Sequence, residues 1–242
     1  MPPRRTARER VRAEITREIT DVARAQLAAD GAAALSLRAV ARELGMVSSA
    51  VYRYFASRDE LLTALIIDGY NALGAAVEQA DAACARDDYP GRWGAATGAV
   101  RDWALAHPHE YALLYGSPVP GYQAPADTIV PAGRSAVVFG RLASDAFAAG
   151  ALTPPDPAAP APPPLAQDLA QLRDAIMPDV PDEVIAAALT AWAGVFGLIS
   201  FELFGQFNNV ISDRPAFFGH AAAGLGALFG LPTETPGKPR TP

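Results

Sequence analysis

Hydrophobic residues recur along this chain at the spacing of helices rather than with the alternation of strands. The clearest short pattern lies at 36–55, SLRAVARELGMVSSAVYRYF, where apolar positions follow the i, i+3, i+4, i+7 spacing of a one-sided helix. Those positions are Leu37, Val40, Ala41 and Leu44. Ser36 precedes them and is a preferred N-cap residue type, so a helix is predicted to begin directly after it.

The same segment predicts a sharp turn and a second helix. Gly45 follows the first apolar stripe, and glycine tolerates the left-handed backbone that ends a helix and redirects the chain. A second helix is predicted from about Ser48, with Val47, Val51 and Phe55 pointing inward at every fourth position. Two short helices joined by such a turn set one helix into the major groove of DNA. An ordinary helical hairpin inside an all-helical protein is the alternative.

The other apolar patterns predict helices almost throughout and no strand. A first helix is expected to end near Asp30-Gly31, and a long helix is expected to open at the capping box Ser57–Glu60 and to continue toward Ala83. Further helices are predicted at 91–106, 108–115, 127–149, 165–177, 181–206 and 214–229.

These elements predict an all-α fold in two domains. An N-terminal arm and a three-helix, helix-turn-helix domain are assigned to 1–56, and a C-terminal effector-binding and dimerisation domain to 57–231. Within the latter, the proline-rich stretch 154–164 is expected to be an extended, mobile surface loop, because proline cannot sustain helical hydrogen bonds. The tail at 232–242 is expected to be disordered.

Charge is distributed unevenly along the chain. Residues 1–60 contain 11 arginines and 8 acidic residues, a net charge of +3, whereas the whole chain has a formal net charge of -6. The remaining residues therefore carry -9. Positive charge beside the predicted helix pair suits contacts with phosphates, because neutralising them releases counterions and supplies much of the affinity for DNA.

Other classes of function have less support. Cys84 is the only cysteine, which excludes an internal disulfide and a cysteine-based zinc cluster and suits an intracellular, cytoplasmic protein. His107, His109 and Glu110 cluster at a predicted helix junction, where capping explains them, so no metal and no cofactor are assigned. No motif places a serine or cysteine nucleophile beside a base, so an enzyme is not expected.

One segment has the composition of a membrane span. Residues 184–201 include 18 positions without a charge, which barely reaches the length needed to cross a bilayer. A helix that lines a subunit core on one side and meets a partner subunit on the other is also apolar all round. We therefore expect no membrane contact and predict a dimer interface here, with a final helix that offers Phe217, Phe218, Leu225 and Leu228.

Residues 15–65, centred on DGAAALSLRAVARELGMVSSAVYRYFASRDELLTALI, resemble the DNA-binding domain of the tetracycline-repressor (TetR) family. The remainder resembles one C-terminal domain of that family, the WHG domain, especially over 100–122 and 191–207. Relatives often carry Trp and then His-Gly, where this chain has Trp192 and then Phe196-Gly197. The resemblance implies a homodimer that binds double-stranded DNA at a near-palindromic operator, with half-sites about 34 to 36 Å apart or somewhat more.

The resemblance also implies which residues face DNA. Positions that match the family's DNA-facing places are Arg38, Ser48, Ser49, Ala50, Tyr52, Arg53, Tyr54 and Arg58. Arg53 is the candidate for a bidentate contact to guanine, and Ala50 for a contact to a thymine methyl. Ser48, Tyr52, Tyr54 and Arg58 are candidates for phosphate contacts.

A small-molecule site is expected in the C-terminal domain, because ligand pockets are mostly apolar with a few polar groups that fix orientation. Its candidate residues are Trp103, His107, Tyr111, Tyr115, Phe139, Trp192 and Phe196. The effector is expected to be hydrophobic or aromatic.

The predicted function is a DNA-binding transcriptional repressor that a small molecule releases from its operator. The effector would change the spacing of the recognition helices through the long helix that starts at Arg58. The alternative is a dimeric DNA-binding protein with an architectural role or a protein partner and no small-molecule effector.

Overall fold

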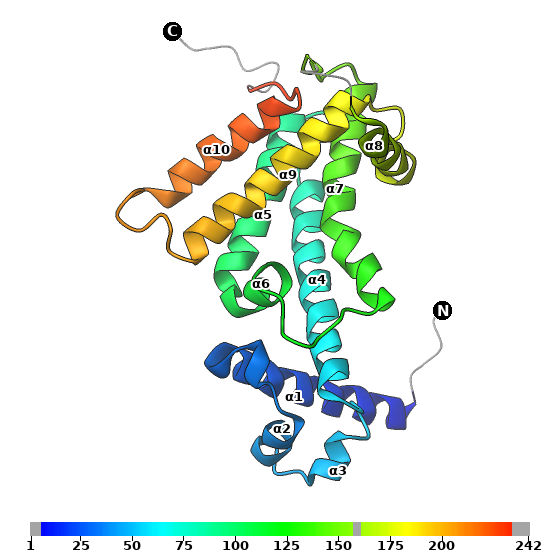
Figure 1. Cartoon of the computed structure of the whole chain (residues 1–242), viewed down its shortest axis with the longest axis vertical. Coiled ribbons are helices and arrows are strands. Elements are labelled where there is room, and N and C mark those ends of the chain that lie inside the picture. The colour runs from blue at the N-terminus through cyan, green and yellow to red at the C-terminus, as the bar shows by residue number, and fades with distance from the viewer. Residues whose placement is uncertain (1–5, 157–160, 234–242) are drawn as a thin grey trace. The chain divides into compact units, whose positions relative to one another are not determined.

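The computed structural model describes residues 6–156 and 161–233 of the 242, and every regular element in these ranges is helical. The prediction of an all-α fold is confirmed. The contacts divide the chain into two compact units, whose helices are labelled in Figure 1. The first unit comprises 1–71 and 107–132, and the second comprises 72–106 and 133–242. The long helix α4 (Arg58–Ala82) begins in the first unit and ends in the second.

The first unit is built around α1 (Ala7–Asp30), α2 (Leu37–Glu43), α3 (Ser48–Val51) and the start of α4. The 3-10 helices η1 (Ala32–Ala34) and η2 (Ala126–Thr128) and the helix α6 (Pro108–Tyr115) belong to the same unit. Its apolar side chains form one core cluster, which includes Ile19, Ala23, Leu37, Val40, Ala41, Val51, Phe55, Leu61, Leu62 and Leu65. The short helices α2 and α3 are therefore stabilised by this shared core rather than by their length.

Two details of the helix pair differ from the sequence prediction. Val47 was expected to point inward, but its side chain is 71% exposed, because the residue stands at the N-cap of α3, before the helix begins. Beyond Val51 the chain continues as tightened turns, in which the Tyr54 N–H donates to the Val51 carbonyl oxygen at 2.9 Å. Val51 and Phe55 are buried as predicted.

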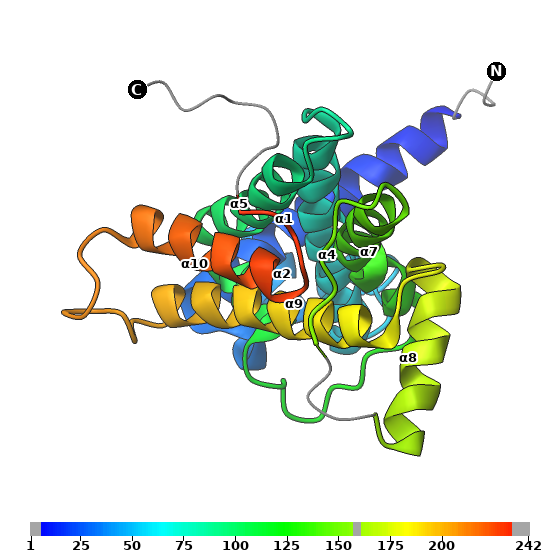
Figure 2. The same ribbon diagram turned by 90° about the horizontal axis from the view of Figure 1, so that it is seen from above.

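The second unit packs α5 (Tyr89–Ala106), α7 (Ile129–Ala148), α8 (Pro163–Ile176), α9 (Asp182–Leu203) and α10 (Arg214–Leu228) with the end of α4. Figure 2 shows α10 running along α9, and α9 also packs against α5 and α8. A buried ion pair joins α5 to α9, because the Arg101 guanidinium donates to both carboxylate oxygens of Glu202, at 2.8 and 2.6 Å. The predicted helices of this region are confirmed within a few residues at each end.

The proline-rich stretch is only partly outside helices. Pro163 and Pro164 form the first turn of α8, whereas an extended loop was predicted through residue 164. The first turn of a helix leaves its N–H groups without intrahelical partners, so proline is tolerated there. Residues 157–160 of the predicted loop, and 234–242 of the predicted tail, lie outside the described residues.

Two helices, α4 and α9, are long and apolar enough to cross a membrane by length and composition. Core helices have the same properties, and α9 packs against three other helices of its unit. Its buried positions include Val184, Ile185, Val195 and Ile199. Packing inside the protein therefore accounts for the buried positions of α9, whereas other apolar positions, such as Phe201, are exposed in the protomer.

Candidate nucleic-acid interface and apolar cavity

The turn between α2 and α3 fixes the direction of the second helix. The Ser36 hydroxyl accepts a hydrogen bond from the Ala39 N–H at 3.4 Å and caps α2. Gly45 has a φ of 65°, in the left-handed region, and the Met46 N–H then donates to the Ala41 carbonyl oxygen at 2.8 Å. Both sequence predictions for this turn, the Ser36 cap and the left-handed glycine, are confirmed.

The predicted DNA-facing residues lie on α2, on α3 and in the turns after it. Ser48, Ser49, Tyr52, Arg53 and Arg38 are exposed. Ala50 and Tyr54 are half-buried in the same segment, so the α3 segment presents polar and cationic side chains above an apolar underside. Ser, Arg and Tyr side chains are able to bind base edges and phosphates in the major groove.

Arg58 differs from the other predicted contacts, because the protein itself uses its guanidinium. Its Nη2 donates to the carbonyl oxygen of Ala32 at 2.8 Å and to that of Ala33 at 3.3 Å. The guanidinium also lies 3.5 Å from the Asp59 carboxylate. Arg58 therefore ties the start of α4 to η1, and it has fewer N–H groups to offer a phosphate than an unpaired arginine.

The N-terminal part of α1 lies beside the segment that follows α3. The Arg12 guanidinium is 5.1 Å from the centre of the Tyr54 ring, and its Nη2 donates to the Arg53 carbonyl oxygen at 3.4 Å. Arg8 and the exposed Val11 border the same open hollow. This arrangement brings additional cationic groups next to the predicted recognition residues.

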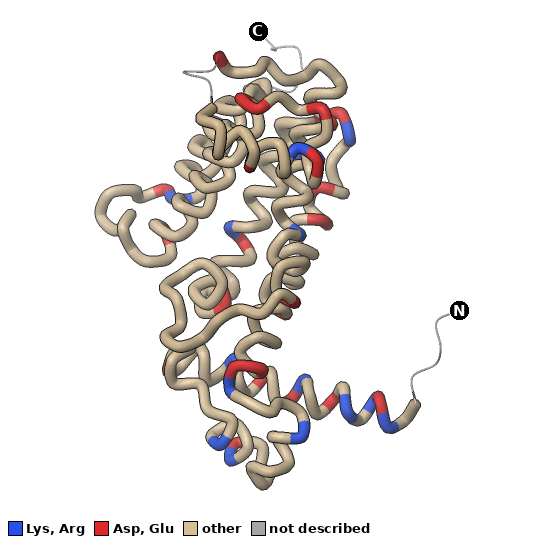
Figure 3. Tube along the Cα trace, turned by 45° about the vertical axis from the view of Figure 1, so that its right-hand side comes forward, with Lys and Arg blue, Asp and Glu red and all other residues tan. Residues whose placement is uncertain are grey.

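Ion pairs occupy most described arginines of the second unit, but only Arg24 and Arg58 among those of the first. In the second unit, Arg86, Arg92, Arg101, Arg134 and Arg173 each form an ion pair with a carboxylate. Among the described residues of the first unit, no ion pair is formed by Arg8, Arg10, Arg12, Arg17, Arg38, Arg42 or Arg53. Figure 3 shows basic positions along α1 and around the α2–α3 segment. The positive charge left available for an external anion is thus concentrated around the helix pair.

The predicted effector residues are divided between the two units. His107, Tyr111 and Tyr115 belong to the first unit, where the Tyr111 and Tyr115 rings lie 5.1 Å apart. Phe139 and Trp192 belong to the second unit and line one cavity of about 110 Å³. Trp103 and Phe196 are buried in that unit, but they are not among the residues that line this cavity.

The cavity also contains residues that sequence reasoning did not select. They include Trp93 on α5, Met177 after α8 and Phe229 after α10. The Trp93 ring meets the rings of Phe139 and Phe229 with centroids 5.4 and 5.1 Å apart. Because a core aromatic and a cavity aromatic have the same helical spacing, the sequence carries no signal that separates them.

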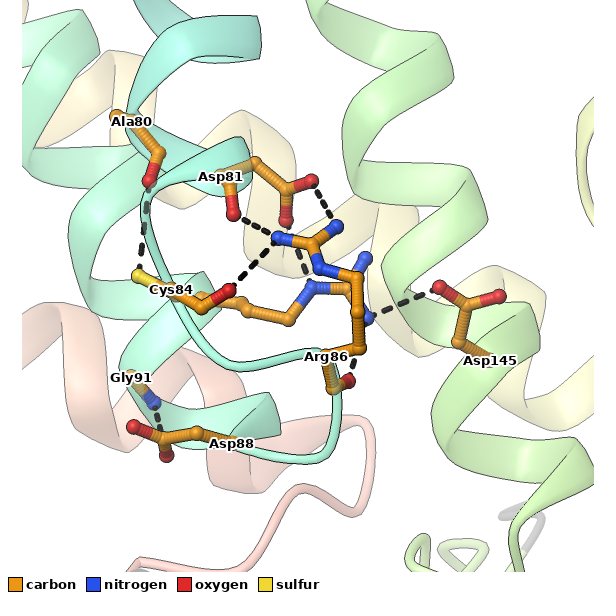
Figure 4. Close-up of polar contacts among 8 residues, drawn as sticks. Ala80, Asp81, Cys84, Arg86, Asp88, Gly91 and Asp145 are labelled. Carbon is orange, nitrogen blue, oxygen red and sulfur yellow. Dashed lines mark hydrogen bonds and ion pairs between the residues drawn. The ribbon is translucent and has the colours of Figure 1, made fainter.

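A second missed feature is the buried ion network around Arg92, next to Trp93 in the chain. The Arg92 side chain is only 2% exposed, and its guanidinium donates to Asp81 of α4 at 2.8 Å and to Asp145 of α7 at 2.9 Å. Arg86 adds an ion pair to Asp81 at 2.8 Å, as Figure 4 shows. Burial alone would raise the pKa of Asp81, but hydrogen bonds from Arg92 and Arg86 outweigh it and lower that pKa. The network joins α4, α5 and α7.

The cluster at the start of α6 has a different role from the predicted one. His107 occupies the N-cap position of α6 but makes no capping hydrogen bond with its side chain. Glu110 forms an ion pair with Arg24 of α1 at 3.0 Å. Within the described ranges, no group of three or more His, Cys, Asp or Glu residues has a geometry that could hold a metal ion.

Comparison with known proteins identifies two matched regions. Residues 19–65 match the family model described as bacterial regulatory proteins, tetR family, and residues 93–225 match the model described as tetracyclin repressor-like, C-terminal domain. The chain is 46% identical over 220 residues to the HTH-type transcriptional regulator Rv1816 of Mycobacterium tuberculosis (strain ATCC 25618 / H37Rv), covering 89% of this chain and 90% of that protein.

Solved structures agree with these matches. The crystal structure of the regulatory protein SCO4313 has a TM-score of 0.72 and 36% sequence identity, and the match covers 91% of this chain and 98% of that one. The crystal structure of a bacterial regulatory protein in the tetR family from Rhodococcus RHA1 has a TM-score of 0.61 at 21% identity, covering 90% of this chain and 97% of that one. The second likeness supports the fold.

Proposed function

The chain belongs to the TetR family of DNA-binding transcriptional regulators, and on that premise we propose that it is a cytoplasmic repressor which a small molecule releases from its operator. The family and the similar curated proteins are transcriptional regulators, so the chain is a regulator and not an enzyme. The observation that carries the proposal is the set of unpaired arginines around an exposed recognition segment, together with a separate apolar cavity in the second unit.

Base reading is assigned to the exposed side chains of the α3 segment. Arg53 is exposed and forms no ion pair among the described residues, so its guanidinium is available for a bidentate contact with guanine. Ser48, Ser49 and Tyr52 are exposed beside it and would bind phosphates or base edges. We expect Arg58 to contribute less to phosphate binding than the other arginines do, because its guanidinium already donates hydrogen bonds to carbonyl oxygens of η1.

A homodimer is proposed through the outward faces of α9 and α10. On α9 the exposed positions include Ala193, Gly197 and Phe201, which recur every fourth residue, and Phe201 is 52% exposed. On α10 the exposed positions include the small residues Ala216, Gly219, Ala223, Gly224 and Ala227. The α9 and α10 faces of two protomers would pack closely in a four-helix interface. This interface would bury apolar surface that is exposed to water in a single protomer.

Two residues expected at that interface pack inside the protomer. Phe218 is only 6% exposed, and the Arg101 guanidinium lies 5.5 Å from its ring centre. Leu225 faces Gly194 of α9, where a Cβ on the glycine would come within 2.8 Å of its side chain. The interface proposed here therefore uses small residues and the α9 phenylalanine in place of these two side chains.

Communication between effector and DNA is proposed to run through α4. The helix supplies Leu61, Leu62 and Leu65 to the core of the first unit, and its Asp81 to the Arg92 network of the second. The same network holds α5 and α7, which both line the cavity. An effector that binds the DNA-incompetent form about 100-fold better would shift the equilibrium by at most about 2.7 kcal/mol per site.

The rival function is a DNA-binding dimer without an effector. It predicts a second unit that is filled by its own side chains, whereas a cavity of about 110 Å³ lies among the aromatic residues there. This cavity favours the ligand-responsive function.

Selection of bound fragments from the source organism's own DNA tests the proposal. Purified protein is incubated with the fragments at about 0.15 M salt, where non-specific binding to phosphates is weakened. Enrichment of a near-palindromic sequence upstream of genes supports the proposed function. A folded protein that enriches no sequence contradicts it.

A further inference from the structure

The cavity of the second unit has a buried floor and a more open rim. Trp93, Phe139, Met177 and Phe229 form the floor, and each side chain is at most 8% exposed. Leu172 and Ile176 of α8 and Leu189 of α9 also line it and are more exposed, with Leu189 at 36%. A ligand would therefore enter on the side of α8 and α9 and reach toward α5 and α7.

We propose that this cavity binds one electrically neutral aromatic molecule, about the size of a substituted benzene ring, that carries a single hydrogen-bond acceptor. The proposal rests on the proposed function, since it names the chemical class of the effector at that same site. Four observations on the lining carry it: the absence of charge, the volume, the aromatic character, and one buried donor without a partner among the described residues.

The described lining contains no ionisable side chain. Its residues are aromatic, aliphatic, glycine, alanine or methionine. A carboxylate, phosphate or ammonium group would lose its hydration there and gain no ion pair, and burial of such a charge is strongly unfavourable. Charged ligands are excluded on this physical ground.

Volume limits the size of the ligand. The cavity measures about 110 Å³. A cavity of roughly 150 Å³ lined by apolar side chains in another protein stays dry and binds benzene. A single substituted ring is therefore the largest rigid group that fits this cavity with small adjustments at the rim.

The walls favour an aromatic ligand with one acceptor. The rings of Trp93, Phe139, Trp192 and Phe229 all contribute to the lining, and aromatic groups prefer edge-to-face and offset contacts with one another. The Trp93 Nε1–H donates to the Ala222 carbonyl oxygen at 2.7 Å, so that donor is already satisfied. The Nε1 of Trp192, a lining residue, is buried and has no hydrogen-bond partner among the described residues; a small rotation of this ring would let it donate to an acceptor on the ligand, and a buried donor gains from an acceptor.

Three probes of similar size test the class of ligand on the full-length protein. Acetophenone is neutral and has one acceptor, ethylbenzene is neutral and has none, and benzoate carries a charge on the same ring. Binding is measured by calorimetry and by the rise in the thermal unfolding midpoint, since a ligand that binds only the folded state stabilises it. We expect acetophenone to bind more tightly than ethylbenzene, and benzoate to produce no rise.

Three variants locate the binding. Ala136→Leu on α7 fills the cavity and is expected to weaken acetophenone binding by about tenfold or more. Ala148→Leu makes the same change at an exposed position of α7, and its acetophenone binding should match the wild type. Trp192→Phe keeps an aromatic wall but removes the donor, so acetophenone should lose its advantage over ethylbenzene.

Several results would overturn the inference. Benzoate binding as tightly as acetophenone would contradict the claim of neutrality, and unchanged binding in Ala136→Leu would place the ligand elsewhere. If none of the three probes stabilises a protein that still selects an operator sequence, the assigned ligand class is wrong while the DNA-binding function stands. Loss of operator selection in the wild type would instead contradict the proposed function itself.

Discussion

At the scale of single residues, arginine has two roles in this molecule, and its ion pairs distinguish them. Arg92 and Arg101 are held between helices by carboxylates, whereas Arg53 and Arg12 form no ion pair among the described residues. The held residues stabilise the fold. The unpaired residues are available for DNA, and the two roles predict different effects of mutation.

Arg53→Ala is expected to remove the preference for one base of the operator. A bidentate contact to guanine contributes about 1–3 kcal/mol of discrimination between bases. The variant's affinity should therefore fall for the operator with the preferred base and change little for operators with another base at that position. Competition binding with operators altered at one position measures this. A uniform loss at every position would contradict base reading by Arg53.

Arg12→Ala is the counterpart of Arg53→Ala and tests a contact with the phosphate backbone of DNA. Its guanidinium lies over the Tyr54 ring at the edge of the recognition segment. We expect weaker binding to all sequences alike and a slope of log affinity against log salt that is smaller by about one. An unchanged slope would show that Arg12 does not contact phosphate.

Arg92→Met is expected to destabilise the second unit by about 1–3 kcal/mol, because it removes the hydrogen bonds that the buried guanidinium donates to Asp81 and Asp145, while Asp81 keeps its ion pair with Arg86. Arg86→Met removes a side chain that is 55% exposed and should cost only about 0–1 kcal/mol. Urea unfolding of both variants measures the difference. Equal, small losses would mean that the network adds little to stability.

The network also gives a direction for the effect of pH. The pKa of Asp81 is lowered in the folded protein, so its contribution to stability is present above the ordinary carboxylate pKa and is lost as pH falls through the lowered value. The stability difference between wild type and Arg92→Met should therefore shrink in acid.

At the scale of elements, the helices could be predicted because their signals are local. The Ser36 cap, the left-handed Gly45 and the apolar stripe of α2 lie within ten residues of one another, and the structure has all three. The exposure of Val47 could not be predicted from the periodicity, because this residue is the N-cap of α3 and lies before the helix, where helical spacing does not apply. The cavity could not be predicted either, since it depends on which aromatic residues of four helices meet.

Gly45→Ala tests the turn between α2 and α3. The glycine has a φ of 65°, and a Cβ there would meet no atom within 4 Å, so the expected cost of about 1–2 kcal/mol comes from the backbone alone. Gly133→Ala is the control, because that glycine lies within α7, also has space for a Cβ, and should become more stable by about 0.5–1 kcal/mol. Thermal unfolding and operator binding together measure the effect. Unchanged stability in Gly45→Ala would show that the turn does not require glycine.

At the scale of the whole molecule, recognition of a near-palindromic operator requires two protomers on one DNA site. Ala193 of α9 is exposed on the proposed interface, so Ala193→Arg should separate the dimer and leave the protomer folded. Ala148→Arg on the exposed face of α7 is the control and should remain dimeric. Light scattering after size exclusion measures the mass. A wild-type protein that is monomeric at micromolar concentration would contradict the proposed dimer.

The molecule is proposed to recognise a particular DNA sequence, and the ratio of two affinities measures that recognition. The selected operator and a shuffled duplex of the same length and composition are compared with one protein preparation at about 0.15 M salt. We predict that the operator binds tighter by about a thousandfold or more, the range typical of specific regulators. Equal affinities for the two duplexes would contradict sequence-specific recognition.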